Sequence, residues 1–193
     1  MEIKIEPYNL KLGGLTGIKP YKKKIERRLS DLRDLFYYKD IVEEKLMKGE
    51  NPKIYEVYEV PQEPIEGYLN VASTILFPGK IGDEYYFTKG HFHERETASE
   101  VYIGLRGEGL ILMQNREGEV RYLRITHNSC VFIPPGFAHR TINIRAQPLI
   151  FLAVYPANAG HDYGSIAERG FHKIVVDRNG KPVIIDNPRR NQR

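Results

Sequence analysis

From residue 54 onward, short apolar segments follow one another so closely that the chain has no room for helices between them. About eleven segments, the first reading IYEVYEV and the last PVIID, are rich in β-branched and aromatic residues and are separated by Gly, Pro and Asn. Such segments are typical of β-strands joined by tight turns. Parallel strands would need long crossover connections, so the pattern argues against a βαβ sheet. It predicts an all-β domain over residues 54–193, built as a closed antiparallel barrel or a jelly roll.

Residues 1–53 follow a different pattern and are expected to form an N-terminal extension with short helices. Asp40 and Glu43 resemble a capping box, and the apolar stripe after them closes at Gly49, which predicts a helix over DIVEEKLMKGE. SDLRDLFYY, at residues 30–38, is expected to form a shorter helical turn. No repeat interrupts the chain, so we expect one domain overall.

Charge and composition disfavour several classes of function. The net charge is +4, and much of the excess lies in KPYKKKIERR, where Glu26 interrupts the run. A solvated face, or a field that steers anionic substrates, is therefore favoured over a nucleic-acid surface. No apolar run approaches the ~20 residues that span a bilayer, and MEIKIEPYNLKLGG has no hydrophobic stretch typical of a secretory signal. The single cysteine, Cys130, is expected to be a small core residue in a cytoplasmic protein.

Two histidines in TKGHFHERETASEVYIGL suggest a metal site. Alternate residues of a strand face the same side, so His91 and His93 point one way. Glu100 and Tyr102 share a face of the next segment, and an adjacent strand could therefore bring the carboxylate to the imidazoles. Two histidines at this spacing are a weak signal by themselves, because they can also fall on one face by chance. A further ligand is needed.

The segment PPGFAHRTIN supplies that ligand. Its Pro-Pro-Gly turn is rigid and can aim the following strand inward, where His139 is placed. Three neutral imidazoles and one carboxylate suit a divalent first-row ion such as Fe, Mn, Ni or Zn, with positions left for water or substrate oxygens. The residues predicted to hold the ion are His91, His93, Glu100 and His139.

This combination resembles the two signature motifs of the cupin superfamily. The motifs appear here as His91-x-His93 with Glu100 and Gly107, and as Pro134-x-Gly136-x-x-His139-x-x-x-Asn143. Six residues separate His93 from Glu100, a longer gap than most cupins have, and Asn128 stands where a glycine is usual. Together with FLAVYPANAGHDYGSI, the long gap is similar to that of the cupin-type phosphoglucose isomerases of archaea. The similarity extends from about residue 54 to residue 188.

The resemblance implies a cupin jelly-roll barrel and a homodimeric, metal-dependent isomerase. Such an enzyme interconverts glucose 6-phosphate and fructose 6-phosphate in glycolysis and gluconeogenesis. The four residues named above match the family's metal ligands, for one divalent ion per subunit, with Fe²⁺ first and Mn²⁺, Ni²⁺ or Zn²⁺ as alternatives. The residues that match substrate-binding positions are Thr74, Thr88 and Gly90 at the phosphate end and Tyr102, Tyr155, His161 and Tyr163 around the sugar. Those expected to take part in catalysis are Glu100, His161 and Tyr155.

Strand parity sets one condition on this assignment. Strict alternation would put Thr88 and Gly90 on the face opposite His91 and His93. If all four residues serve one pocket, a bulge near Gly90 must reset the register. Lys89 shares the histidines' face by parity, and it could assist phosphate binding or extend its ammonium group to solvent.

Several alternatives stay open at this level. The same ligands would suit another metal-dependent cupin such as an oxygenase, or a non-catalytic sugar-binding cupin. Without the resemblance, Thr74 and Thr88 are ordinary strand residues and His161 is a solvated loop side chain. Isomerisation could proceed by proton transfer through an enediol, with Glu100 as the base, or by a hydride shift. A dimer contact is expected at the N-terminal helical segment or at an exposed strand edge. No binding to nucleic acid or to a membrane is expected.

Overall fold

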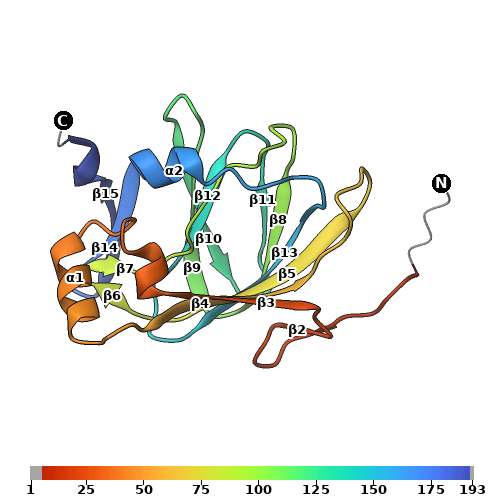
Figure 1. The fold of residues 1–193 in the computed structure, drawn as a ribbon, viewed down its shortest axis with the longest axis horizontal. Coiled ribbons are helices and arrows are strands. Elements are labelled where there is room, and N and C mark those ends of the chain that lie inside the picture. Colours follow the sequence, from red (N-terminus) through yellow and green to blue (C-terminus); the bar gives the residue numbers. More distant parts are fainter. Residues whose placement is uncertain (1–5, 192–193) are drawn as a thin grey trace.

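The computed structural model describes residues 6–191, and its strands pair into antiparallel sheets that face one another across the core (Figure 1). The largest sheet has six strands in the order β11-β8-β13-β5-β4-β3. These strands are β3 (Lys23–Arg28), β4 (Lys53–Val60), β5 (Leu69–Leu76), β8 (Glu100–Arg106), β11 (Cys130–Ile133) and β13 (Leu149–Pro156). Every neighbouring pair in this sheet runs antiparallel.

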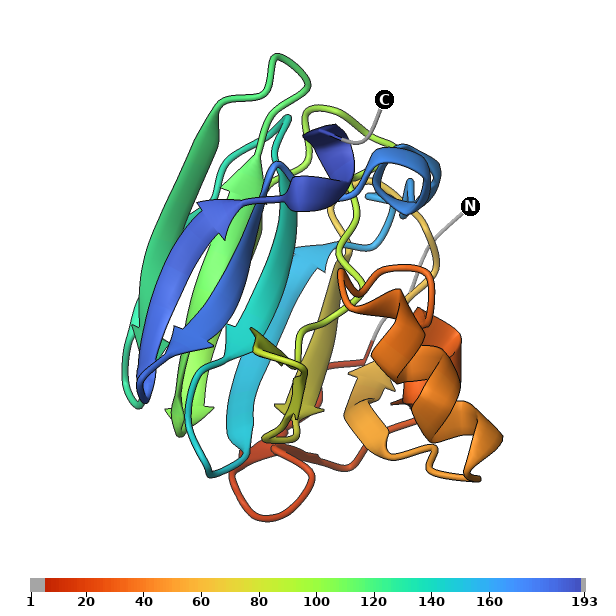
Figure 2. The same cartoon turned by 90° about the vertical axis from the view of Figure 1, so that its left-hand side faces the viewer.

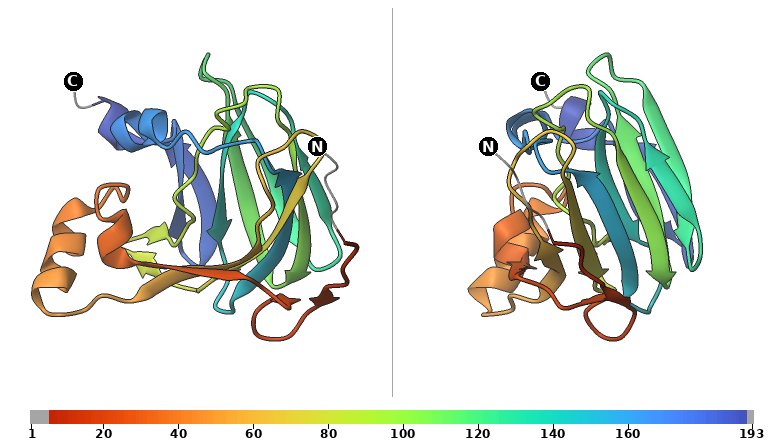
Figure 3. Two further views of the ribbon diagram at one scale, coloured as in Figure 1. Left: turned by 45° about the vertical axis from the view of Figure 1, so that its right-hand side comes forward. Right: turned by 90° about the vertical axis from the view of Figure 1, so that its right-hand side faces the viewer.

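A three-stranded sheet faces the largest sheet, as the side views show (Figure 2 and Figure 3). Its order is β10-β9-β12, with β9 (Glu108–Gln114), β10 (Val120–Thr126) and β12 (Ala138–Asn143). A further sheet, in the order β15-β14-β7-β6, contains β6 (Lys80–Ile81), β7 (Glu84–Tyr85), β14 (Lys173–Arg178) and β15 (Lys181–Asp186). A short hairpin precedes these sheets and consists of β1 (Lys11–Leu12) and β2 (Ile18–Lys19).

Alternation along the strands directs side chains into the space between the sheets. On β8, Glu100 and Tyr102 are buried, whereas Val101 between them is only partly covered. Phe87 and Phe151 are among the largest fully buried side chains of the core between the sheets. The all-β prediction is confirmed, and the arrangement is a cupin jelly-roll barrel with a short helical extension.

The helical elements are few. They are η1 (Leu29–Leu32), α1 (Lys39–Met47), α2 (Gly164–Arg169) and η2 (Pro188–Asn191). The helix predicted over DIVEEKLMKGE is confirmed as α1, and Gly49 follows it with a φ of 77°. The predicted capping box is wrong, because the helix begins one residue before Asp40 and Tyr38 occupies the N-cap without a side-chain hydrogen bond. Glu43 instead forms an ion pair with Arg33 at 2.6 Å.

Strand β3 is one that the apolar pattern does not predict. Its sequence KKIERR is almost entirely charged, yet it pairs along β4. Cross-strand ion pairs join the two strands, from Lys23 to Glu59 at 3.2 Å and from Lys24 to Glu56 at 2.8 Å. The boundary between residues 53 and 54 stays a prediction, and β3 and β4 pair across it.

Two findings concern the outer surface. Cys130 is exposed and is not a core residue, because Val131, its neighbour on the edge strand β11, takes the inward position. Phe132 is exposed on the same strand.

Within residues 6–191, no helix has both the length and the apolar character needed to cross a bilayer.

Candidate active site

The segment that leads into the first histidine contains a one-residue bulge. Phe87 bridges to Ile142 and His91 bridges to His139. Three residues lie between the two bridges on the histidine segment, but only two lie between them on β12. The extra residue falls where Gly90 has a φ of 76°, in the left-handed region that favours glycine. The bulge predicted near Gly90 is therefore confirmed.

The bulge brings residues of opposite parity to one cavity. Thr88, Gly90 and His91 all line the same pocket. A side chain could not replace the hydrogen of the glycine, because a Cβ at Gly90 would lie 2.7 Å from an atom of the Phe171 ring. The glycine thus allows both the backbone turn and the close packing behind it.

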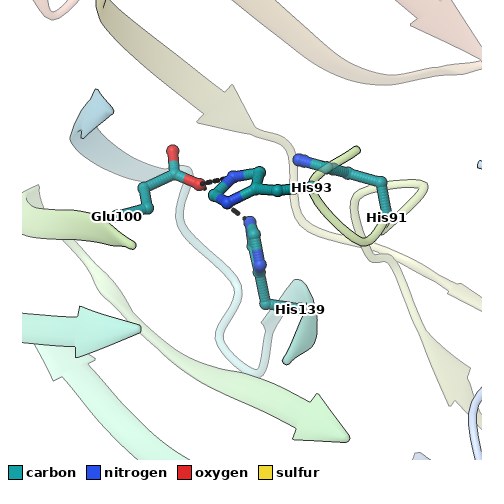
Figure 4. A group of neighbouring side chains, drawn as sticks. All are labelled: His91, His93, Glu100 and His139. Atoms are coloured by element: carbon teal, nitrogen blue, oxygen red, sulfur yellow. Dashed lines mark ion pairs between the residues drawn. The ribbon is translucent and has the colours of Figure 1, made fainter. Parts of the chain in front are cut away.

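Three histidines and one glutamate converge beside this pocket (Figure 4). His91 and His93 come from the segment before β8, Glu100 begins β8, and His139 lies on β12. One potential ligand atom from each residue lies within 4.8 Å of the other three. The Oε2 atom of Glu100 lies 2.9 Å from Nε2 of His139 and 3.3 Å from Nε2 of His93. The structure thus gathers all four predicted ligands.

The donor atoms of this cluster fit a metal ion. Nε2 of His91 is buried and makes no hydrogen bond, although buried polar atoms usually have partners. Nε2 of His93 and Nε2 of His139 both face the Glu100 carboxylate. Nδ1 of His93 lies 3.1 Å from the carbonyl oxygen of Ala98, and Nδ1 of His139 lies 3.4 Å from that of Phe137. These carbonyls hold the rings with Nε2 directed at the cluster. Three imidazole nitrogens and a carboxylate oxygen can bind a divalent first-row ion.

Electrostatics favour a neutral imidazole at His91 and an ionised carboxylate at Glu100. Burial lowers the pKa of His91 well below its usual range, and the neighbouring His139 and His161 lower it further. Burial by itself would raise the pKa of Glu100, but His139 and His93 outweigh burial and hold that pKa below its usual range. Both groups are thus in the form that binds a cation.

The pocket beside the cluster gathers every residue predicted to contact substrate. These residues are Thr74, Thr88, Gly90, Tyr102, Tyr155, His161 and Tyr163. Thr74, Tyr102 and Tyr155 project from β5, β8 and β13 of the largest sheet, whereas His161 and Tyr163 belong to the loop before α2. The pocket therefore joins one wall of the barrel to a loop from the far end of the sequence.

The loop that carries His161 is fixed to the ligand segment. The N–H of Phe92 donates to the carbonyl of Asp162 at 3.0 Å, and the N–H of Asp162 donates back at 2.9 Å. The His161 ring packs against His91, with centroids 4.4 Å apart, and stacks on Tyr163 at 5.7 Å. Burial lowers the pKa of His161, so its imidazole is neutral at pH 7. This histidine is a packed side chain rather than a solvated one.

Basic and aromatic side chains complete the pocket. Arg27 on β3 lines it, and so does Lys89, whose Nζ lies 4.5 Å from the centroid of the Tyr163 ring. The sequence motifs did not indicate Arg27; alternation along KKIERR places it with Ile25, but only once β3 is recognised as a strand. Tyr55 on β4 also lines the pocket, and burial raises its pKa to about 12, so its hydroxyl stays protonated.

A jelly-roll barrel with three histidines and one glutamate beside an internal pocket defines a cupin whose site can hold a metal ion. The sequence model of the family described as Glucose-6-phosphate isomerase (GPI) matches residues 26–192. The chain belongs to this glucose-6-phosphate isomerase family.

Individual relatives agree with the family match. The glucose-6-phosphate isomerase of Pyrococcus abyssi is 52% identical over 184 residues, which cover 95% of this chain and 97% of the relative. That of Thermococcus litoralis is 50% identical, with 95% and 96% covered, and that of Sinorhizobium medicae is 35% identical, with 84% and 77% covered. Among solved structures, an oxalate oxidase has a TM-score of 0.49 and 15% identity, over 60% of this chain and 57% of that chain. The family assignment rests on the sequence matches.

Proposed function

We propose that this protein is a metal-dependent glucose-6-phosphate isomerase, which interconverts glucose 6-phosphate and fructose 6-phosphate. The observation that carries the proposal is one pocket that has a four-ligand cluster and, in the same lining, groups suited to a phosphate. Relatives that bear the name of this enzyme match nearly the whole chain. The reacting carbons of the sugar would lie near the cluster and the phosphate away from it.

The phosphate would bind near Thr74, Thr88 and Gly90. Oγ1 of Thr88 accepts a hydrogen bond from the N–H of Thr141 at 3.0 Å, so its own hydroxyl proton can point at a phosphate oxygen. Arg27 and Lys89 add positive charge to the pocket lining, which suits a dianionic substrate. Neither an oxygenase nor a site for an uncharged sugar requires this charge, and it therefore favours a phosphorylated sugar.

The metal would be held by His91, His93, Glu100 and His139. When bound, a divalent ion supplies Lewis-acid polarisation of the substrate carbonyl. We propose one ion per subunit, with Fe²⁺ in first place; Mn²⁺, Ni²⁺ and Zn²⁺ also suit imidazole and carboxylate donors.

The side chains around the sugar would move the protons. Glu100, ionised and buried, would take the proton from carbon 2 and return it to carbon 1, so that the reaction passes through an enediol. His161, neutral at pH 7, would transfer a proton between the two sugar oxygens and assist ring opening. Burial raises the pKa of Tyr155, so its hydroxyl stays protonated and can donate to a sugar oxygen.

A coupled assay of fructose 6-phosphate conversion tests the proposal. The protein is assayed as purified, after chelation, and after addition of Fe²⁺, Mn²⁺, Ni²⁺ or Zn²⁺, with its metal content measured in parallel. We expect activity to fall on chelation and to return with at least one of these ions. The absence of turnover with all four ions would overturn the proposal.

The proton route has its own test. Glu100→Gln that retains its metal should lose most of its turnover, because an amide cannot accept the proton from carbon 2. In heavy water, the wild-type protein should introduce deuterium at carbon 1 of the fructose 6-phosphate that it forms from glucose 6-phosphate. Product without deuterium, together with substantial turnover in Glu100→Gln, would favour the hydride shift.

We further propose that the enzyme is a cytoplasmic homodimer that works in glycolysis and gluconeogenesis. Edge strand β11 supports the dimer, because an exposed strand edge favours pairing and Phe132 on it is 57% exposed. Leu12 and Leu15 in and beside the N-terminal hairpin are exposed as well. Sedimentation equilibrium at micromolar concentration measures the state directly, and a monomer would contradict this part of the proposal.

A further inference from the structure

Arg140 is a buried cation directly behind the pocket. It follows His139 on β12 and is only 4% exposed. Its guanidinium carbon lies 4.1 Å from the centroid of the Phe87 ring and 4.4 Å from that of Phe171. Burying a guanidinium group between two rings costs desolvation free energy that the cation–π contacts offset only in part. The burial of Arg140 is therefore not explained by a gain in stability, which points to a role in the site.

The hydrogen bonds of Arg140 show what it holds. Its Nη2 donates to the carbonyl oxygen of Lys89 at 2.9 Å, and its Nε is buried without a hydrogen bond. Within residues 6–191, no carboxylate lies within ion-pair distance of its guanidinium group. Glu84, a carboxyl group whose charge raises the pKa of Arg140, instead accepts a hydrogen bond from the N–H of Tyr37 at 2.7 Å. The side chain is thus committed to the backbone of the bulge.

Holding the carbonyl of Lys89 also orients the next amide. In a trans peptide the C=O and the N–H of one peptide unit point in opposite directions. The only cis peptide within residues 6–191 is Lys19-Pro20, so the Lys89–Gly90 peptide is trans. Its carbonyl points back to Arg140, which does not line the pocket, and its N–H therefore points toward the pocket that Gly90 lines. No hydrogen bond within residues 6–191 uses this N–H.

We infer that Arg140 is a positioning residue for the phosphate of the substrate. It fixes the Lys89–Gly90 peptide so that the Gly90 N–H donates to a phosphate oxygen, and its charge attracts the dianion from behind the loop without touching it. This inference rests on the proposed function. Arginine suits the role better than lysine, because a planar guanidinium group can stack between two rings and still donate in its plane.

Kinetics of Arg140→Met and Arg140→Lys test the inference. Methionine keeps most of the volume but removes both the donor and the charge, whereas lysine keeps the charge and loses the stacking. For Arg140→Met we expect KM for fructose 6-phosphate and Ki for inorganic phosphate to rise about 10- to 100-fold, the range for one hydrogen bond to a charged group. The metal content should stay the same and kcat should change less than about threefold. Arg145→Met, an exposed arginine outside the pocket, is the matched control and should keep wild-type values.

A second measurement needs no substitution. Only two of the 17 glycines follow a lysine, Gly49 and Gly90. Labelling lysine with carbonyl carbon-13 and glycine with nitrogen-15 therefore selects two amide signals in the zinc-loaded protein. Addition of inorganic phosphate should shift the Gly90 amide proton downfield. Gly49, whose N–H donates to the carbonyl of Leu46 at 3.0 Å, should not move.

The outcomes separate the inference from the proposed function. If the wild-type protein is active and Arg140→Met has unchanged KM and Ki, the role of Arg140 is overturned and the isomerase proposal stands. An unshifted Gly90 signal at phosphate concentrations that inhibit turnover would overturn it as well, even if Arg140→Met fails to fold. A loss of kcat and of bound metal with unchanged KM would identify Arg140 as a support for His139 instead. Wild-type protein without activity would refute the proposed function itself.

Discussion

Replacing Glu84 by glutamine should remove a pH dependence from the stability of the fold. Glu84 lies on β7, is 1% exposed, and accepts the N–H of Tyr37 at 2.7 Å from the segment that leads into α1. Burial raises its pKa from the usual 4.5 to about 7, although the hydrogen bond from Tyr37 and the charges of Arg140 and Arg189 act in the opposite direction. The carboxyl group therefore stays protonated in the folded protein under conditions in which the unfolded chain has already lost the proton.

The sign and size of the effect follow from proton linkage. Between pH 4.5 and pH 7 the folded state binds more protons at Glu84 than the unfolded state, so the free energy of unfolding falls as the pH rises. The part of the free energy of unfolding that comes from this pKa difference is fully present below pH 4.5 and is lost above pH 7. At about 1.4 kcal/mol for each pH unit, the interval corresponds to about 3 kcal/mol. Glutamine cannot ionise, and its amide oxygen can still accept the N–H of Tyr37.

Guanidinium unfolding of the chelated protein between pH 4.5 and pH 8 measures this effect. The chain has no tryptophan, so far-ultraviolet circular dichroism and tyrosine fluorescence are the probes. Contributions from groups that the two proteins share cancel in the difference. The free energy of unfolding of Glu84→Gln, relative to wild type, should rise by about 3 kcal/mol between pH 4.5 and pH 7.5. Glu63→Gln, an exposed control, should show no rise, and a flat difference for Glu84→Gln would refute the reasoning.

Three further substitutions probe the site. His139→Ala should lower the affinity for a first-row metal by at least about 100-fold, since even residues that only support ligands are worth about 10- to 100-fold, and competition with a chelating dye measures it. Gly90→Ala should cost about 1–3 kcal/mol of stability, measured by denaturant unfolding, because its φ of 76° and the Phe171 ring oppose a Cβ. His161→Gln should lower kcat about 100-fold in steady-state assays while the metal content is unchanged; equal turnover would remove His161 from the proton transfer.

The barrel could be predicted from the sequence because its strands carry a local signal. Apolar alternation and turn residues recur throughout the second part of the chain, and each strand of the core shows them without reference to its partners. β3 lacks this signal. Its lysines and arginines become strand residues only because the carboxylates of Glu56 and Glu59 stand opposite on β4, and such pairing is invisible until the neighbour is known.

The candidate site likewise contains residues that the sequence predicts and residues that it does not. The four metal-type ligands lie in two short motifs, and the conflict of parity between Thr88 and His91 was enough to predict the bulge at Gly90. Arg27 could not be predicted, because its strand was not. Tyr55 faces the pocket from β4, where an aromatic residue at an inward position is equally typical of ordinary core packing.

Arg140 shows most clearly where local reasoning ends. An arginine in the middle of a strand ordinarily faces solvent, and the parity of AHRTIN places it opposite His139, which agrees with a surface position. The face opposite His139 is not a surface, however, because Phe87 and Phe171 cover it from segments that are distant in the sequence. Consecutive residues of β12 therefore serve two sides of one site: His139 faces the metal cluster, and Arg140 holds the backbone loop proposed to receive the phosphate. A shift of β12 by one residue would exchange the faces of His139 and Arg140. The metal cluster and the proposed phosphate end of the pocket therefore both require the same register of β12.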